Sequence, residues 1–329
     1  MTQTGDDDSA SVRILMVGTK DFALPTFERL CDSPYQIIGL VTQPDRPQGR
    51  KQELIPAPIK VAALERRLPV FQPESINAPE SLERIREFAP DLIVTAAYGQ
   101  ILSADLLSIP RFGGINLHGS VLPSYRGAAP VARAIQSGDK ESGVTVIRMT
   151  PKVDAGGMIA FARTPIEPDE TADELESRLA SLGAPLLVET IAKIIDGTAQ
   201  IIPQDPARVT KAPKLRKEEG RIDWSRPAQA VHDHIRAMRP WPLADTLYPV
   251  HGRRAEPLRL IVHQTRVVAG NGVPGEILEV PGDRFVIACG SEALQILTVQ
   301  VAGKKAMPVR DFLRGHPAFV GHRLGQESS

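Results

Sequence analysis

Short apolar runs alternate with amphipathic segments along the first part of the chain. The apolar runs are rich in Val and Ile, are bounded by Gly, Pro or Asp, and occur at residues 13–19, 37–42, 91–98, 114–118 and 143–149. Runs of this kind are typical of buried strands, and helical periodicity separates some of them, at 57–67 and 79–88. Strands that alternate with helices form βαβ units, so we predict an α/β domain with a doubly wound, mostly parallel sheet.

A further strand is expected at 158–166, and a long amphipathic helix at 171–197 closes the first domain. The pattern changes in the last third of the chain. After one helix at 227–238, short apolar segments alternate with glycine turns at residues 259–268, 275–280, 284–288 and 294–301. Several short strands in a domain of about 100 residues favour a small antiparallel β-barrel, which we expect to be OB-like.

The domain organisation follows from these elements. Residues 203–222 are rich in charge and have no clear period, which indicates a basic linker. We therefore expect four parts: a disordered acidic tail at 1–11, a catalytic domain at 12–202, the linker at 203–222, and the barrel domain at 223–324.

Composition places the chain among ordinary globular proteins. It has 329 residues, 42% of them hydrophobic, and only two cysteines. No apolar run approaches the ~18 residues that cross a bilayer, and the first eleven residues lack the features of a signal peptide. We expect a cytoplasmic protein that does not contact membranes. Two cysteines without metal-ligand spacing favour neither a disulfide framework nor a metal site.

The charge of the chain is balanced overall but unevenly distributed. Lys and Arg number 39, as do Asp and Glu, whereas residues 205–323 hold 19 basic and 12 acidic side chains. Clustered cations bind phosphate backbones whatever their sequence. The basic second half therefore suggests a polyanionic partner, although a surface charge gradient without function explains the same count.

The segment "INLHGSVLPSYRGAAP", residues 115–130, carries the strongest chemical signal. In an extended strand alternate side chains point the same way, so Asn116 and His118 share one face. An amide can donate to a developing oxyanion and an imidazole can transfer a proton, which suits acyl transfer. Asp154, in a polar segment after a later strand, supplies a carboxylate. The alternative is that Asn116 caps a turn and His118 is a hydrogen-bonded core residue.

Several other chemistries are disfavoured by missing motifs. The first strand runs into "VGTKDFALP" rather than a Gly-x-Gly-x-x-Gly turn, so a dinucleotide cofactor is disfavoured. The sequence also contains no P-loop lysine motif, no zinc spacing and no Gly-x-Ser-x-Gly elbow. Any chemistry is therefore expected to rest on side chains, without a metal.

Several blocks of the sequence resemble one family. They are "GTKDFALP", "VTQPDRPQGR", "AAYGQILS", "INLHGSVLPSYRGAAPVARAIQSGD", "GVTVIRMTPKVDAGGMI", "KLRKEEGRIDW", "RPWPLADT" and "QVAGKKAM". Between about residues 13 and 324 the chain is similar to methionyl-tRNA formyltransferases. The resemblance implies a Rossmann-like formyltransferase domain that binds 10-formyltetrahydrofolate and a C-terminal domain that binds initiator methionyl-tRNA. It also implies formylation of the methionine amino group for translation initiation, and we expect a monomer.

The resemblance also implies roles for individual residues. It assigns Asn116, His118 and Asp154 to catalysis. Folate contacts fall on Ser120, Val121, Leu122, Pro123, Tyr98 and Gly99. Contacts with the aminoacyl-tRNA fall on Phe22, Arg46, Arg50, Lys51, Lys214, Arg216, Lys304 and Lys305. The match weakens at Lys51-Gln52-Glu53, where relatives are expected to carry a denser basic run.

Two alternatives stay open at this point. A folate-dependent formyltransferase that acts on a small amine, such as an amino sugar nucleotide, keeps the same three catalytic residues but does not need the basic second half. A nucleic-acid-binding protein with an inactive α/β domain keeps the basic half but has no turnover. Incubation with 10-formyltetrahydrofolate and each amine distinguishes them.

Overall fold

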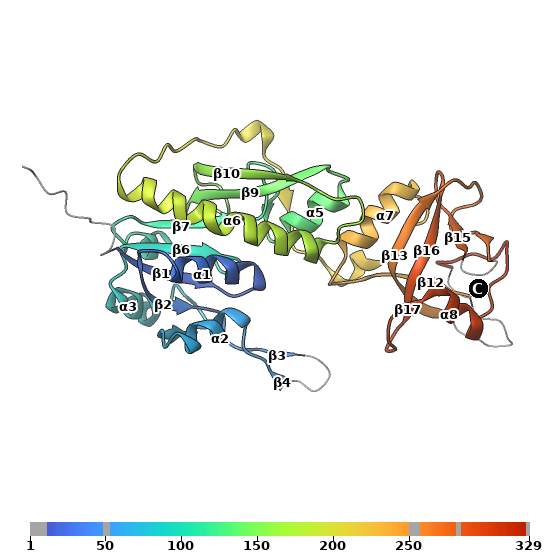
Figure 1. Ribbon diagram of the computed structural model, residues 1–329, viewed down its shortest axis with the longest axis horizontal. Coiled ribbons are helices and arrows are strands. Elements are labelled where there is room, and N and C mark those ends of the chain that lie inside the picture. The colour runs from blue at the N-terminus through green and yellow to red at the C-terminus, as the bar shows by residue number, and fades with distance from the viewer. Residues whose placement is uncertain (1–11, 49–52, 250–256, 281–283, 327–329) are drawn as a thin grey trace, which may run out of the picture. The chain divides into compact units, whose positions relative to one another are not determined.

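The computed structural model describes residues 12–48, 53–249, 257–280 and 284–326 (Figure 1). The chain forms two compact units, each built from several sequence segments. The first unit takes residues up to 130 together with 141–164 and 176–213, and the second takes 131–140, 165–175 and 214 onward. The expected acidic tail at 1–11 lies outside the described residues, and the expected domain limits stay a prediction.

A seven-stranded sheet forms the centre of the first unit, in the order β10-β9-β7-β6-β1-β2-β5. Its strands are β1 (Arg13–Gly18), β2 (Gln36–Val41), β5 (Val70–Phe71), β6 (Leu92–Ala96), β7 (Gly114–His118), β9 (Glu141–Arg148) and β10 (Met158–Pro165). The neighbouring strands β5, β2, β1, β6 and β7 pair in parallel, while β9 pairs antiparallel with β7. The expected mostly parallel sheet is confirmed. Two short strands, β3 (Pro47–Gln48) and β4 (Glu53–Leu54), form a separate pair.

The helices match the periodic segments closely where those segments are long. The helices are α1 (Leu24–Cys31), α2 (Pro58–Glu65), α3 (Pro79–Phe88), α4 (Ala104–Leu107), α5 (Pro130–Gln136), α6 (Ala172–Ile195), α7 (Ala228–Ala237) and α8 (Val309–Gly315), with 3-10 turns η1 (Asp21–Ala23), η2 (Pro206–Arg208) and η3 (Lys217–Gly220). Pro58 and Pro79 each occupy a first helical position, where the missing N–H costs no hydrogen bond. The four expected helices therefore correspond to α2, α3, α6 and α7.

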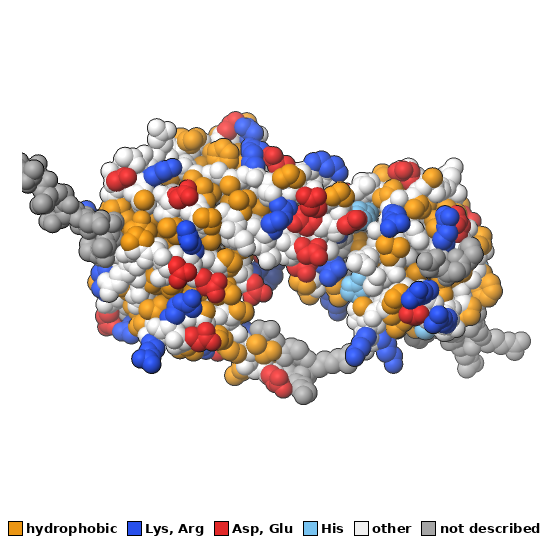
Figure 2. All heavy atoms as spheres, viewed as in Figure 1, with side chains coloured by type: hydrophobic (Ala, Val, Ile, Leu, Met, Phe, Trp, Pro, Cys, Tyr) orange, Lys and Arg blue, Asp and Glu red, His pale blue; other side chains and the backbone are white. Residues whose placement is uncertain are grey.

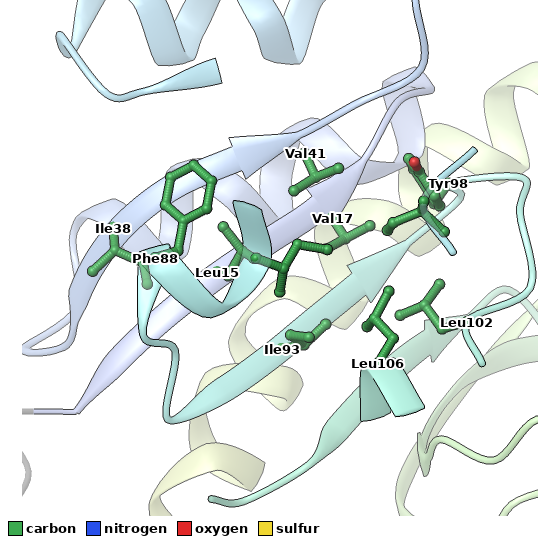
Figure 3. Packing of buried hydrophobic residues seen from close by; sticks show 11 residues of the cluster. Leu15, Val17, Ile38, Val41, Phe88, Ile93, Tyr98, Leu102 and Leu106 are labelled. Atoms are coloured by element: carbon green, nitrogen blue, oxygen red, sulfur yellow. The ribbon is translucent and has the colours of Figure 1, made fainter. Parts of the chain in front are cut away.

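One face of the first sheet is covered by α3 and α4. Phe88 of α3 and Leu106 of α4 pack against Leu15, Val17 and Ile93 of the strands, in a cluster whose members are almost fully buried (Figure 3). Tyr98 belongs to the same cluster, and only 5% of its surface is exposed. The apolar runs at 13–19 and 91–98 therefore form the core, as their composition predicts.

The opposite face of β7 is covered by α6. A Cβ atom added to Gly183 of α6 would lie 2.6 Å from Leu117, so this helix approaches the strand as closely as a glycine allows. Because neighbouring side chains on a strand point to opposite faces, Asn116 and His118 point away from α6. The alternation expected from the sequence thus fixes which face carries the polar pair.

An antiparallel sheet in the order β12-β13-β16-β15-β14 curls through the second unit (Figure 1). Its strands are β12 (Ala244–Tyr248), β13 (Leu258–Val268), β14 (Ile277–Glu279), β15 (Phe285–Ala288) and β16 (Ala293–Val301), and β17 (Met307–Pro308) pairs with β16. The curled sheet is consistent with the expected small antiparallel barrel. The sequence reading missed β12, whose two ends are marked by prolines.

The core of the second unit is aromatic. Tyr248 of β12 meets Phe312 of α8 edge to face, with 4.9 Å between the ring centroids, and its hydroxyl donates to the carbonyl of His316 at 2.8 Å. Burial raises the pKa of Tyr248 to about 12. A tyrosine that is buried but hydrogen-bonded in this way packs α8 onto the sheet without leaving a polar atom unpaired.

Candidate functional site

Asn116 is held by the neighbouring strand β6. Thr95 lies opposite Asn116 in the parallel register of β6 and β7, and its hydroxyl donates to the Asn116 Oδ1 at 2.7 Å. Thr95 is only 3% exposed, so this hydrogen bond is shielded from water. Since the amide oxygen faces Thr95, the amide nitrogen points the other way, where it can donate to a ligand.

His118 is buried, and each of its ring nitrogens faces an oxygen atom. The imidazole Nε2 lies 2.9 Å from the carbonyl oxygen of Tyr125, and Nδ1 lies 3.6 Å from Asp154 Oδ2. A carbonyl oxygen only accepts hydrogen bonds, so Nε2 carries the hydrogen. In a neutral ring, Nδ1 therefore holds the lone pair and is the atom that can take a proton.

Asp154 reaches His118 from a turn between β9 and β10. Its Oδ2 accepts a hydrogen bond from the Gly127 N–H at 2.9 Å, and its backbone has a positive φ of 47°. Gly156 follows in the same turn, where an added Cβ would lie 1.6 Å from the carbonyl oxygen of Arg148. The "DAGG" sequence thus allows a tight turn that returns a carboxylate to the end of β7.

The turn between β7 and β8 (Arg126–Gly127) is held by the hydroxyl groups of Ser120, within the turn, and Thr145, on β9. Ser120 Oγ donates to the Ser124 carbonyl at 2.6 Å. Thr145 Oγ1 donates to the Ser120 carbonyl at 2.7 Å and accepts from the Leu122 N–H at 3.0 Å. Leu122 and Pro123 are buried and Val121 is half-buried. The Ser120 hydroxyl therefore serves the turn, and the folate contacts expected for residues 120–123 stay a prediction.

Tyr98 and Gly99 follow β6 at the same edge of the sheet. The Tyr98 carbonyl accepts a hydrogen bond from Gln43 Nε2 at 3.1 Å. Among the described residues its buried hydroxyl has no hydrogen-bond partner, and burial raises the pKa of Tyr98 to about 12. Gly99 has a φ of 92°, and within the described part of the chain a Cβ there would meet Gln43 alone, at 3.9 Å. Backbone and amide groups beside such an uncrowded glycine suit a flat heterocycle with polar edges, such as a pterin.

Gln43 and Gln100 were missed by sequence reasoning. Gln100 Nε2 lies 3.3 Å from Gln43 Oε1, so two carboxamides meet where β2 and β6 end. Ligands of open α/β sheets bind at the carboxyl ends of strands. A glutamine directly after an apolar run, as in "LVTQ", is the signal that would have found Gln43.

The residues expected to contact tRNA belong to both units of the chain. Phe22 is buried, with 5% of its surface exposed, as a core residue is. Arg46 is exposed and pairs with Glu74 at 2.6 Å. Arg50 and Lys51 lie outside the described residues. The remaining four are exposed and belong to the second unit: Lys214, Arg216, Lys304 and Lys305. All of these contacts stay predictions.

Three further observations concern the surface charges, the described helices and possible metal ligands. Figure 2 shows Lys and Arg side chains spread over the visible face of the second unit, with acidic side chains among them. In the part of the chain that the structure describes, no helix has the length and apolar character to cross a membrane, and no three potential ligands of the His, Cys, Asp or Glu type form a metal-binding group.

Comparisons with known proteins identify the family of this chain. A family model described as "Formyl transferase" matches residues 11–191, and one described as "Formyl transferase, C-terminal domain" matches residues 214–317. A methionyl-tRNA formyltransferase from Geobacillus thermodenitrificans is 44% identical over 96% of this chain and 98% of its own length. The chain belongs to the methionyl-tRNA formyltransferase family. A relative of that name from Pseudomonas putida is 43% identical over 96% of this chain and all of its own.

Solved structures show the same fold at low sequence identity. An N-formyltransferase from Helicobacter canadensis, in complex with folinic acid and dTDP-3-aminofucose, aligns with a TM-score of 0.64 and 16% identity. The alignment covers 87% of this chain and 99% of that protein. HypX from Aquifex aeolicus with tetrahydrofolic acid gives 0.61 over 92% of this chain and 46% of that protein. At such identities the likeness establishes the fold, which members of this family share with folate-binding proteins.

Proposed function

We propose that this member of the family transfers the formyl group of 10-formyltetrahydrofolate to the free amino group of methionine on initiator tRNA. The observation that carries the proposal is the convergence of Asn116, His118 and Asp154 at the end of β7. Relatives that are 41% to 44% identical over nearly the whole chain share one name, methionyl-tRNA formyltransferase. The alternative of a small amine such as an amino sugar nucleotide is not favoured.

The folate would lie at the edge where β2, β6 and β7 end. The backbone at Gly99 and the carboxamide of Gln43, which Gln100 holds in place, would bind its ring, and the turn at residues 120–123 would border its formyl-bearing part. When bound, 10-formyltetrahydrofolate supplies an electrophilic formyl carbon. The chain contributes binding, orientation and proton transfer.

Asn116 is placed to donate to the formyl oxygen. With its Oδ1 held by Thr95, the amide nitrogen can point a hydrogen at an oxygen that gains negative charge as the amine attacks. Donors held in place before the reaction stabilise such charge without reorganising. Removal of one donor of this kind typically costs about 3 kcal/mol of barrier.

His118 is placed to receive the proton that the attacking amine loses. With Nε2–H donated to the Tyr125 carbonyl, Nδ1 is the basic atom, and after proton transfer each N–H of the imidazolium faces an oxygen. Asp154 then balances the new positive charge at 3.6 Å. We therefore propose His118 as the base and Asp154 as its charged partner, with Asn116 donating to the oxyanion.

The second unit is proposed to bind the tRNA, and because translation initiation takes place in the cytoplasm, we expect the protein there. The excess of basic residues in 205–323 and the exposed Lys214, Arg216, Lys304 and Lys305 support this proposal, because phosphate backbones bind clustered cations. We expect the protein to act as a monomer without a metal.

A substrate comparison tests the function. The protein is incubated with 10-formyltetrahydrofolate and, separately, methionyl initiator tRNA, free methionine or an amino sugar nucleotide, and N-formyl products are measured by mass spectrometry. We expect rapid formylation of the aminoacyl-tRNA alone. Preferred formylation of the amino sugar nucleotide, or no formylation of methionyl-tRNA, would contradict the proposal.

A further inference from the structure

Gln204 lies in the segment after α6 and uses every hydrogen-bonding group of its side chain. Its Nε2 donates to the carbonyl oxygens of Asp154 at 2.8 Å and Gly156 at 2.7 Å. Its Oε1 accepts from Arg126 Nε at 2.9 Å. The residue is 9% exposed, so water has little access to these bonds. A carboxamide has two N–H hydrogens, and both are committed to the turn that carries Asp154.

The groups around Gln204 are in backbone conformations that need support. Asp154 has a φ of 47° and Tyr125 a φ of 63°, in the left-handed region that side chains disfavour. Such conformations persist only where surrounding contacts hold them, and they concentrate at functional sites. Gln204 donates to the carbonyl of Asp154 and accepts from Arg126, the residue after Tyr125.

Strand β8 and the residue before it carry the two backbone groups that bond to His118 and Asp154. The Tyr125 carbonyl, just before β8, accepts from His118, and the Gly127 N–H donates to Asp154. Strand β8 in turn pairs in parallel with β11 (Lys211–Ala212), and a Cβ at Gly127 would lie 2.6 Å from the Ala212 carbonyl oxygen. The segment 204–212 therefore borders the pair on one side.

We propose that Gln204 is a positioning residue that sets the separation between Asp154 and His118 during formyl transfer. The proposal rests on the function proposed above. Gln204 joins the Asp154 turn to β8, so the carboxylate and the Tyr125 carbonyl keep a fixed geometry about the imidazole. Gln204 does not touch the reacting atoms, and its effect on the reaction passes through Asp154.

The test is a double-mutant cycle. Gln204→Glu keeps the oxygen that accepts from Arg126 but loses both donors to the turn. In the otherwise unchanged protein we expect kcat to fall about tenfold with little change in KM, since two hydrogen bonds are lost. In an Asp154→Asn background the same change should lower kcat less than twofold, because residues that act through one group are not additive.

A matched control uses an exposed glutamine that accepts a hydrogen bond through its oxygen. Gln264 is exposed on β13, and its Oε1 accepts from Thr298 Oγ1 at 2.7 Å, so Gln264→Glu should leave kcat unchanged. Gln204→Met serves as the second variant, because it removes the hydrogen bonds without adding a charge. Circular dichroism and urea unfolding establish that each variant is folded.

The outcomes separate this inference from the proposed function. An unchanged kcat in a folded Gln204→Glu or Gln204→Met protein, or an equal loss in both backgrounds, would overturn it. If Asp154→Asn itself keeps the original kcat, the proposed role of Asp154 is wrong. The nitrogen NMR spectrum of His118 then tests whether Gln204 positions the pair. Altered Nδ1 and Nε2 shifts in Gln204→Glu then support positioning, and unaltered shifts reject it.

Discussion

Replacing Thr95 by valine tests whether the orientation of Asn116 matters. The side chain keeps its branched shape but loses the hydroxyl that donates to Asn116 Oδ1 at 2.7 Å. This hydrogen bond favours the orientation in which the amide oxygen faces Thr95 and the amide nitrogen faces away from it. The variant therefore weakens the preference for the orientation in which the amide nitrogen faces the ligand.

The structure sets the size of the effect. A hydrogen bond between uncharged groups contributes about 1 kcal/mol, so its loss changes the ratio of the two amide orientations about fivefold. If that ratio falls from about 5:1 to about 1:1, the share in the productive orientation falls from about 80% to about 50%, so we expect kcat about twofold lower, with the KM values for folate and tRNA unchanged. The buried site also loses a satisfied acceptor, so the free energy of unfolding should fall by about 1–3 kcal/mol.

Steady-state formylation of methionyl-tRNA provides kcat and KM, and urea unfolding provides stability. Thr95→Ser is the matched variant, because it keeps the hydroxyl and loses only a methyl group. It should retain nearly the full kcat while losing about 1 kcal/mol of stability. A Thr95→Val protein with unchanged kcat, or a serine variant as slow as the valine variant, would refute the reasoning.

Three further predictions concern other parts of the chain. Burial lowers the pKa of His234 below 6.5, so protonation favours the unfolded chain, and the free energy of unfolding should drop as the pH falls through 6.5. His234→Gln should make this drop smaller, as measured by urea titrations at pH 7.5 and 5.5. A drop of equal size in the variant would show that His234 does not cause it. Gly156→Ala should lower kcat in the formylation assay and the free energy of unfolding in urea, because the added Cβ meets the Arg148 carbonyl. A fully active and stable variant would exclude this clash. Replacing Lys304 and Lys305 together by alanine should make the plot of log association constant for tRNA against log salt concentration less steep, by about 1.5 in slope. An unchanged slope would show that neither lysine contacts the tRNA.

The elements with long, regular patterns could be predicted from the sequence. The alternation in "INLH" placed Asn116 and His118 on one face of β7, and the "DAGG" turn indicated a carboxylate near them. Both predictions depend on local geometry, because a strand alternates side chains and glycines permit a tight return. The direction of β9 was not predictable, since antiparallel pairing with β7 depends on the path of the connecting chain.

The groups that surround His118 and Asp154 could not be predicted from the sequence. The Tyr125 carbonyl is a backbone group with no sequence signal, and Gln204 lies in a charged stretch that is typical of a linker. Residues 211–212 pair with β8 over two positions only, which is too short for any periodicity. The expected linker at 203–222 therefore contains residues that hold the site, and only three-dimensional contacts reveal them.

The most direct measurement is single-turnover formyl transfer by the Asn116→Ala protein, with folate and tRNA binding measured on the same sample. Because Asn116 is assigned to the oxyanion and not to ground-state binding, the rate should fall about 100-fold or more while both dissociation constants stay within about twofold. A rate close to that of the unchanged protein, with folding intact, would contradict the assignment of this site to catalysis.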